Sequence, residues 1–84
     1  MFSAGAVDAS IFNSERELLD RLDTEPTVTI GAIRQYLIRE YPPEGDHTTY
    51  RLYYNNQCLD NDNLTLADYG WAIGMSGTIT ALSE

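Results

Sequence analysis

The stretch YRLYYNNQCLDNDNLTLADYG, residues 50–70, has the most specific pattern in the chain. Its first part is rich in aromatic residues and alternates in character, which is typical of a β-strand. Leu52 falls on one face of that strand, and Arg51 and Tyr53 fall on the other. The two asparagines at 55–56 are a turn signal. We therefore predict a strand that runs directly into a tight turn.

The second part of the same stretch predicts a loop and a helical turn. DNDN, residues 60–63, consists of polar residues that are typical of loops. LTLADYG, residues 64–70, has the form of a single helical turn, and Gly70 can end it in a left-handed conformation. Trp71 follows this turn, and we expect it to fill the core beneath the loop.

A last alternating segment, GTITAL, occupies residues 77–82. Ile79 and Ala81 fall on one face of this segment. Thr80 and Leu82 fall on the other face. The alternation predicts a second strand with one face toward the core.

The segment TVTIGAIRQYLIREYPP, residues 27–43, predicts an amphipathic helix. The apolar stripe of this helix consists of Ile30, Ile33, Leu37 and Tyr41. The residues that lie off the stripe are Arg34, Gln35, Arg39 and Glu40. Thr29 can cap the start, and the two prolines at 42–43 stop the helix because neither can donate a hydrogen bond to the preceding turn.

The segment before this helix fits two structures. In SERELLDRLD, residues 14–23, Ser14 and Glu17 have the spacing of a capping box, and leucines follow at helical spacing. The same region also fits two short strands joined by an Asn-Ser turn, with Leu18 and Leu22 on one face. The local pattern favours the helix, and both structures remain open at this point.

Composition restricts the classes of function. An 84-residue chain has room for one domain and buries only about 60% of its unfolded surface. Its 13 acidic residues outweigh five arginines, and the net charge of −8 disfavours nucleic-acid binding. The chain contains no lysine, which excludes P-loop, Schiff-base and kinase lysines.

The sequence also favours a soluble, cytoplasmic protein that does not bind membranes. No apolar run approaches the roughly 20 residues of a membrane helix. No basic segment precedes an apolar core at the N-terminus, as it would in a secretory signal. The single cysteine, Cys58, cannot form an internal disulfide.

Taken in order, these segments resemble the ubiquitin-like β-grasp family. The resemblance covers about residues 27–82, and its most specific part is the TLADY turn that follows the RLYY strand. It implies an α+β fold in which a four- to five-stranded mixed sheet packs on one amphipathic helix. It further implies a hairpin over about residues 7–24 within a single ubiquitin-like domain at 7–84. The small, apolar residues at the N-terminus show no period, and we expect a partly ordered lead-in at 1–6. In this family the tyrosine at the position of Tyr69 pins its loop through the hydroxyl.

The resemblance also implies a function and a binding face. Conjugated members end in a Gly-Gly that is activated and transferred, whereas this sequence ends in Leu-Ser-Glu, so we expect a non-conjugated domain that works by being bound. The family's partner surface is the outer face of the sheet and the turn at its rim, which correspond here to Arg51, Tyr53, Asn56, Gln57, Thr80 and Leu82. An exposed tyrosine beside an apolar residue is a composition that interfaces favour. A cross-strand packing role for Tyr53 is the alternative.

The remaining polar residues give no pattern of catalysis or of cofactor binding. His47 lacks a second metal ligand nearby, Cys58 lacks a neighbouring histidine, and residues 60–63 lack the glycine and the closing glutamate of a calcium loop. We therefore expect no enzyme activity, no cofactor and no metal. We expect this chain to be a monomer on its own and to bind a protein partner. The alternative function is a β-grasp accessory subunit of a larger enzyme or secretion complex, with a larger and flatter interface.

Overall fold

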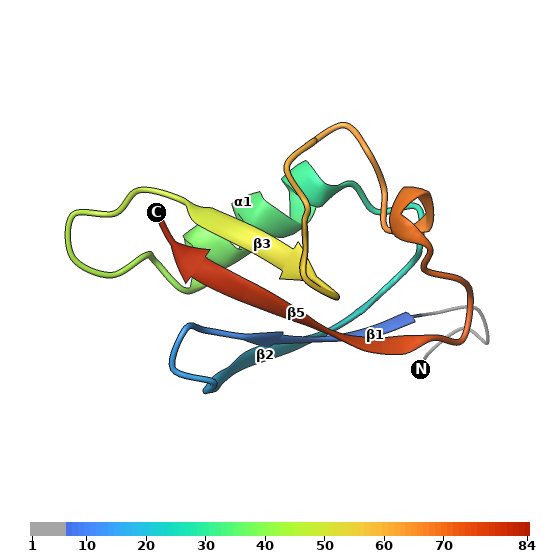
Figure 1. Cartoon of the computed structure of the whole chain (residues 1–84), viewed down its shortest axis with the longest axis horizontal. Helices are drawn as coiled ribbons and strands as arrows, with labels where there is room; N and C mark the ends of the chain where they lie inside the picture. Colours follow the sequence, from blue (N-terminus) through green and yellow to red (C-terminus); the bar gives the residue numbers. More distant parts are fainter. Residues whose placement is uncertain (1–6) are drawn as a thin grey trace.

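The computed structural model describes residues 7–84, so the lead-in predicted for 1–6 lies outside the described residues (Figure 1). The elements, in chain order, are β1 Val7–Phe12, β2 Leu18–Thr24, α1 Ile30–Glu40, β3 Tyr50–Tyr54, β4 Gln57–Cys58, the 3-10 turn η1 Ala67–Tyr69 and β5 Ser76–Ser83. The strands form one sheet in the order β2-β1-β5-β3-β4. β1 and β5 pair in parallel at its centre, and the other pairs are antiparallel, so the sheet is mixed.

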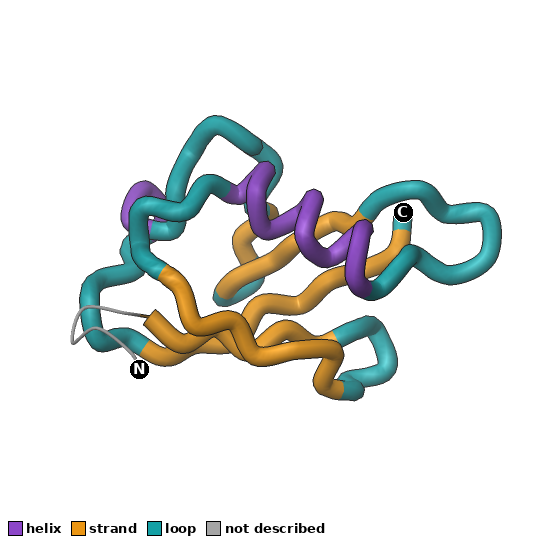
Figure 2. The backbone as a smooth tube through the Cα atoms, turned by 180° about the vertical axis from the view of Figure 1, so that it is seen from behind, coloured by secondary structure: helices purple, strands orange, loops and turns teal. Residues whose placement is uncertain are grey.

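The helix α1 covers one face of the sheet, as the view from behind shows (Figure 2). Its predicted stripe is confirmed, because Ile30, Ile33 and Leu37 are buried against the inner faces of the strands. The Thr29 hydroxyl accepts a hydrogen bond from the Ala32 amide at 3.1 Å and caps the helix as expected. Within residues 7–84 no helix is long and apolar enough to cross a membrane.

The helix that the local pattern favoured for residues 14–23 is wrong, since these residues form a turn and most of β2. Asn13 organises this turn, not the expected capping box. Its side-chain oxygen accepts hydrogen bonds from the backbone amides of Glu15 and Glu17, both at 2.9 Å. Its backbone amide donates to the backbone carbonyl of Glu17 at 2.9 Å. Arg16 closes the turn with a φ of 63°. The hairpin implied by the family resemblance is therefore confirmed.

A β-bulge near the turn changes which leucines of β2 face the core. Ile11 pairs with Asp20, but the next residue of β1 pairs with Leu18, so one residue of β2 is extra. Leu19 and Leu22 consequently pack against the core, whereas Leu18 is 51% exposed. The prediction that Leu18 and Leu22 share a face is wrong, because the bulge breaks the alternation between them.

A hydrogen bond ties α1 to β2, because the Tyr36 hydroxyl donates to Asp20 Oδ2. This hydrogen bond raises the pKa of Tyr36 from 10.0 to about 12 and lowers the pKa of Asp20 below its ordinary value. Because the pKa of Tyr36 is raised on folding, its hydrogen bond stabilises the folded state fully below pH 10.0, and this stabilisation is lost as the pH rises to about 12. The lowered pKa of Asp20 gives the opposite dependence, with stability lost as the pH falls below about 4.

We therefore expect Tyr36→Phe to flatten the dependence of stability on pH. Wild-type protein should lose more stability than the variant between about pH 10 and pH 12, and again below about pH 4. Urea unfolding at a series of pH values measures this difference. Burial and then a hydrogen bond with Asp20 also raise the pKa of Tyr41, so the variant keeps part of this pH dependence. Parallel curves for the two proteins would contradict the assignment.

The TLADYG segment folds as predicted, but its loop is held by other groups than expected. The turn η1 ends at Gly70, whose φ is 98°. The Thr65 amide donates to Asp68 Oδ2 at 2.8 Å, and the Asp68 amide donates to Thr65 Oγ1 at 3.2 Å. Among residues 7–84 the Tyr69 hydroxyl makes no hydrogen bond, and its ring packs against the core. The pinning role implied for this hydroxyl is therefore taken by Thr65 and Asp68.

Candidate partner-binding site

The outer face of the sheet, which lies opposite α1, brings together four of the six predicted residues. β3 and β5 pair so that Arg51 lies across from Leu82 and Tyr53 lies across from Thr80. Directly paired residues share a face of the sheet, and the buried pair between them, Leu52 and Ala81, points inward. Arg51 is exposed, and the other three side chains are partly exposed. We call these four residues the outer-face cluster.

Arg51 keeps its positive charge at the edge of this cluster. It forms an ion pair with Glu84. A hydrogen bond with Tyr53, together with the charge of Glu84, raises the pKa of Arg51 above its ordinary value. The cluster therefore combines one fixed cation, one aromatic ring and one aliphatic side chain.

A hollow of about 550 Å³ adjoins the cluster at the end of β1. Phe12 reaches the outer face because β1 runs parallel to β5 and Phe12 pairs with Thr80. The hollow is lined by Phe12, Asn13, Ser14, Arg16, Thr78, Thr80 and Leu82. Sequence reasoning missed Phe12, although the alternation of VDASIF over residues 7–12 could have placed it on this face once the segment was known to be a strand.

The two remaining predicted residues lie at the β3–β4 turn. Asn55 and Asn56 both have positive φ values, 51° and 63°, which is the geometry of a tight two-residue turn. Asn56 is exposed at its tip. Gln57 pairs with Tyr54 on the helix side of the hairpin, but it is exposed because β4 is the edge strand of the sheet. Cys58 pairs with Tyr53 instead, and this free, half-buried cysteine borders the outer-face cluster.

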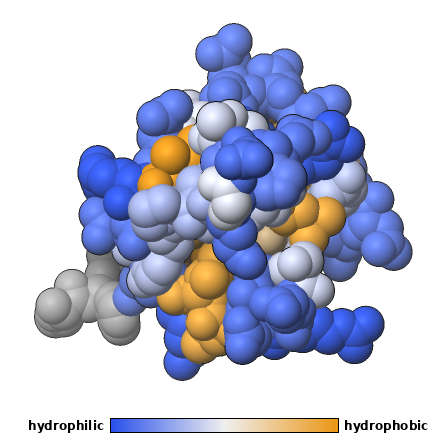
Figure 3. All heavy atoms as spheres, turned by 90° about the vertical axis from the view of Figure 1, so that its left-hand side faces the viewer, coloured by the Kyte–Doolittle hydropathy of each residue, from blue (hydrophilic) through white to orange (hydrophobic). Residues whose placement is uncertain are grey.

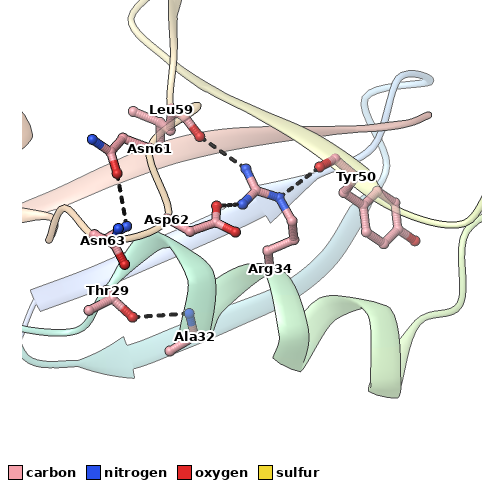
Figure 4. A network of polar contacts seen from close by, with 8 residues as sticks. All are labelled: Thr29, Ala32, Arg34, Tyr50, Leu59, Asn61, Asp62 and Asn63. Carbon is pink, nitrogen blue, oxygen red and sulfur yellow. Dashed lines mark hydrogen bonds and ion pairs between the residues drawn. The ribbon is translucent and has the colours of Figure 1, made fainter.

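Arg34 fixes β3, and with it the outer-face cluster, to the helix (Figure 4). Its guanidinium donates to the carbonyl oxygens of Tyr50 and Leu59, both at 3.0 Å, and forms an ion pair with Asp62. The Gly31 amide also donates to the Asp62 carbonyl at 3.1 Å. The DNDN loop is thus exposed, as expected, but its Asp62 docks the loop onto α1.

The hydrophobic surface is divided at the end of the molecule that carries the β1–β2 turn. There, hydrophobic atoms appear as separate patches between hydrophilic ones (Figure 3). Among residues 7–84 the large hydrophobic side chains with the greatest exposure are Leu18, at 51%, and Ile73, at 67%. Partly exposed side chains such as Phe12, Tyr53 and Leu82 supply the rest of the apolar surface near the sheet.

The described residues hold no arrangement for metal binding. Within residues 7–84 no group of three or more His, Cys, Asp or Glu side chains lies close enough to hold a metal ion. His47 is exposed on the loop between α1 and β3. Trp71 is 2% exposed and packs against Tyr54 with 5.0 Å between ring centroids, which confirms its predicted core position.

The strand order, the parallel central pair and the single helix on one face define the ubiquitin-like β-grasp fold, as predicted. No protein-family model and no curated protein matches the sequence. Ubiquitin of Caldiarchaeum subterraneum has a similar structure, with a TM-score of 0.74 over 95% of each chain and 23% sequence identity.

One human structure and one plant structure are similar to this chain to about the same extent. The C-terminal ubiquitin-like domain of the human 2'-5'-oligoadenylate synthetase-like protein aligns with a TM-score of 0.74 and 15% identity, over 100% of this chain and 90% of that domain. A ubiquitin-fold protein from Arabidopsis thaliana aligns with a TM-score of 0.76 and 14% identity, over 98% and 89%. At these identities the likeness concerns the fold.

Proposed function

We propose that this chain acts as a non-catalytic protein-interaction domain that binds a protein partner through the outer-face cluster. Asn56 and Gln57 form the rim of the site, and a cytoplasmic location is part of the same proposal. The observation that supports this proposal most is that one face of the sheet is left uncovered. α1 covers the inner face, whereas no helix or strand among residues 7–84 covers the outer one.

The chemistry of this face suits a protein partner. Tyr53 and Leu82 offer apolar area, and the hollow beside Phe12 can receive an apolar side chain. Arg51 adds a cation that can select an acidic group on the partner. The overall charge of −8 makes a cation on this face a distinctive feature against an acidic background.

Paired charge substitutions test the proposal. Leu82→Glu introduces a carboxylate into the outer-face cluster, and Ile73→Glu introduces the same carboxylate at an exposed apolar residue on the loop before β5. Wild-type and variant domains are immobilised, and proteins recovered from a lysate of the source organism are quantified by mass spectrometry. We expect Leu82→Glu to lower recovery of the specific partner by about tenfold or more, and Ile73→Glu to leave it unchanged.

The same experiment separates the two functions. Equal recovery by the wild type and by Leu82→Glu would contradict docking through the outer face. Recovery of a multisubunit enzyme or secretion complex that is insensitive to Leu82→Glu would favour the accessory-subunit alternative.

A further inference from the structure

β2 is the long open edge of the sheet. The opposite edge strand, β4, has two residues, whereas β2 has seven and pairs only with β1 among the described strands. An edge strand of this length presents a row of unpaired backbone N–H and C=O groups that can pair with another strand. Natural edges are often protected by charges, so the charge pattern of β2 determines which strand can join it.

The charges of β2 are self-complementary in one register. When two copies of a strand pair in antiparallel fashion about a twofold axis, directly opposed side chains share a face of the extended sheet. With the axis at Leu22, Arg21 of each copy lies opposite Asp23 of the other, and the two leucines meet. An axis at Asp20, Arg21 or Asp23 instead places identical charges opposite each other.

On the outer side of β2, Arg21 of the second copy would reduce a repulsion between two carboxylates. Asp23 lies directly across from Asp8 in the β1–β2 pair, and like charges in that position are destabilising. Arg21 donates to Asp8 Oδ2 at 3.0 Å, whereas no ion pair among the described residues involves Asp23. In the Leu22-centred register, the guanidinium of the second copy would lie opposite Asp23 and relieve the repulsion.

The inner side of β2 adds apolar area to the same pairing. A groove of about 380 Å³ runs between β2 and α1, and its apolar lining includes Leu22, Val28, Ala32 and Ile33. Pairing about Leu22 would bring the grooves of two copies side by side and cover the exposed part of both leucines. Burial of this surface would favour association.

We propose that this chain self-associates by antiparallel β2–β2 pairing centred on Leu22, with two reciprocal Arg21–Asp23 ion pairs. This departs from the monomer expected from the sequence. It is independent of the proposed function, because β1 separates β2 from the strands of the outer-face cluster. Each copy carries a net charge of −8, so the association is weak and salt must strengthen it by screening that repulsion.

Sedimentation equilibrium of the wild-type protein at high concentration gives the first measurement. We expect a monomer–dimer equilibrium whose association constant rises on the order of tenfold between about 0.02 M and 0.5 M NaCl. A monomer at every salt and protein concentration would overturn the proposal. An association that weakens with salt would also overturn it.

Charge-swap variants identify the register. Arg21→Asp and Asp23→Arg should each lose about tenfold or more in self-association, because each places like charges opposite each other. An equimolar mixture of these two variants should form a heterodimer, since their charges are then complementary. The double swap Arg21→Asp with Asp23→Arg in one chain should restore the homodimer.

Matched controls change the net charge by the same amount elsewhere. Arg39→Asp on α1 and Asp46→Arg on the 41–49 loop change exposed residues that lie outside β2, and we expect nearly wild-type association from them after the change in net charge is matched with salt. Single swaps that associate like these controls, or a mixture that fails to pair, would overturn the register. Recovery in the mixture or in the double swap also excludes misfolding as the cause of any loss.

Discussion

Replacing Arg34 by alanine is expected to lower the free energy of unfolding by about 3 kcal/mol. The Arg34 side chain is only 14% exposed, and its guanidinium satisfies two backbone carbonyls and the Asp62 carboxylate. Tyr50 and Leu59, which supply those carbonyls, are themselves buried. Truncation would remove the Arg34 donors from the carbonyl groups and one of the contacts that hold the 59–63 loop on the helix, so the loss is much larger than that of a surface arginine.

Arg39 provides the matched control for this prediction. It lies on the same helix, but it is 71% exposed, and its ion pair is with the adjacent Glu40. Arg39→Ala should therefore change stability by about 0.5 kcal/mol or less. Arg34→Lys should fall between the two, because a lysine keeps the charge but cannot donate to several acceptors in a planar fork. Urea unfolding followed by the fluorescence of Trp71, the only tryptophan, gives all three values. Equal losses for Arg34→Ala and Arg39→Ala would contradict the structural role.

Gly77→Ala is expected to cost about 2 kcal/mol, although alanine normally suits a strand better than glycine does. A Cβ at this position would lie 2.7 Å from Cη2 and 2.9 Å from Cζ2 of Trp71. The indole is 2% exposed and packs against Tyr54, so it has little room to move. The glycine thus allows β5 to pass directly over the ring.

A double-mutant cycle isolates this contact. Trp71→Phe removes the two ring atoms that the new Cβ would meet, so the cost of Gly77→Ala should fall to well below about 1 kcal/mol in that background. Circular dichroism during urea unfolding is the measurement, because the variant background has no tryptophan. The neighbouring exposed residue provides the control substitution Ser76→Ala, which should cost about the same in both backgrounds. An unchanged cost of Gly77→Ala in the Trp71→Phe background would contradict the steric explanation.

The parts of the fold with a strong period could be predicted from the sequence. In α1 every third or fourth side chain faces the core, and in β3 and β5 every second side chain does. Local pattern and tertiary structure therefore agree in these elements. The N-terminal hairpin could not be predicted locally, because one side-chain oxygen of Asn13 organises the turn and a bulge breaks the alternation after Leu18. Because of this bulge, the leucines at 18, 19 and 22 have a spacing that looks helical although they lie on a strand.

The candidate site was predictable to a similar degree. Strand alternation alone places Arg51 and Tyr53 on one face, and pairing with β5 then adds Thr80 and Leu82. Phe12 was missed because its segment was ambiguous, and the pairing of Cys58 with Tyr53 depends on the β3–β4 register, which the local pattern does not give. The roles of Arg34 and Gly77 depend on neighbours that are distant in sequence, so no local pattern indicates them.

Docking of a protein partner on the outer sheet face is tested most directly by amide chemical-shift mapping. The isotope-labelled domain is titrated with the partner recovered by the wild-type protein and lost by Leu82→Glu. The largest shifts should fall on Tyr53, Thr80 and Leu82, with smaller ones around Phe12. Shifts confined to the exposed side of α1, around Gln35 and Arg39, would contradict docking through the outer face.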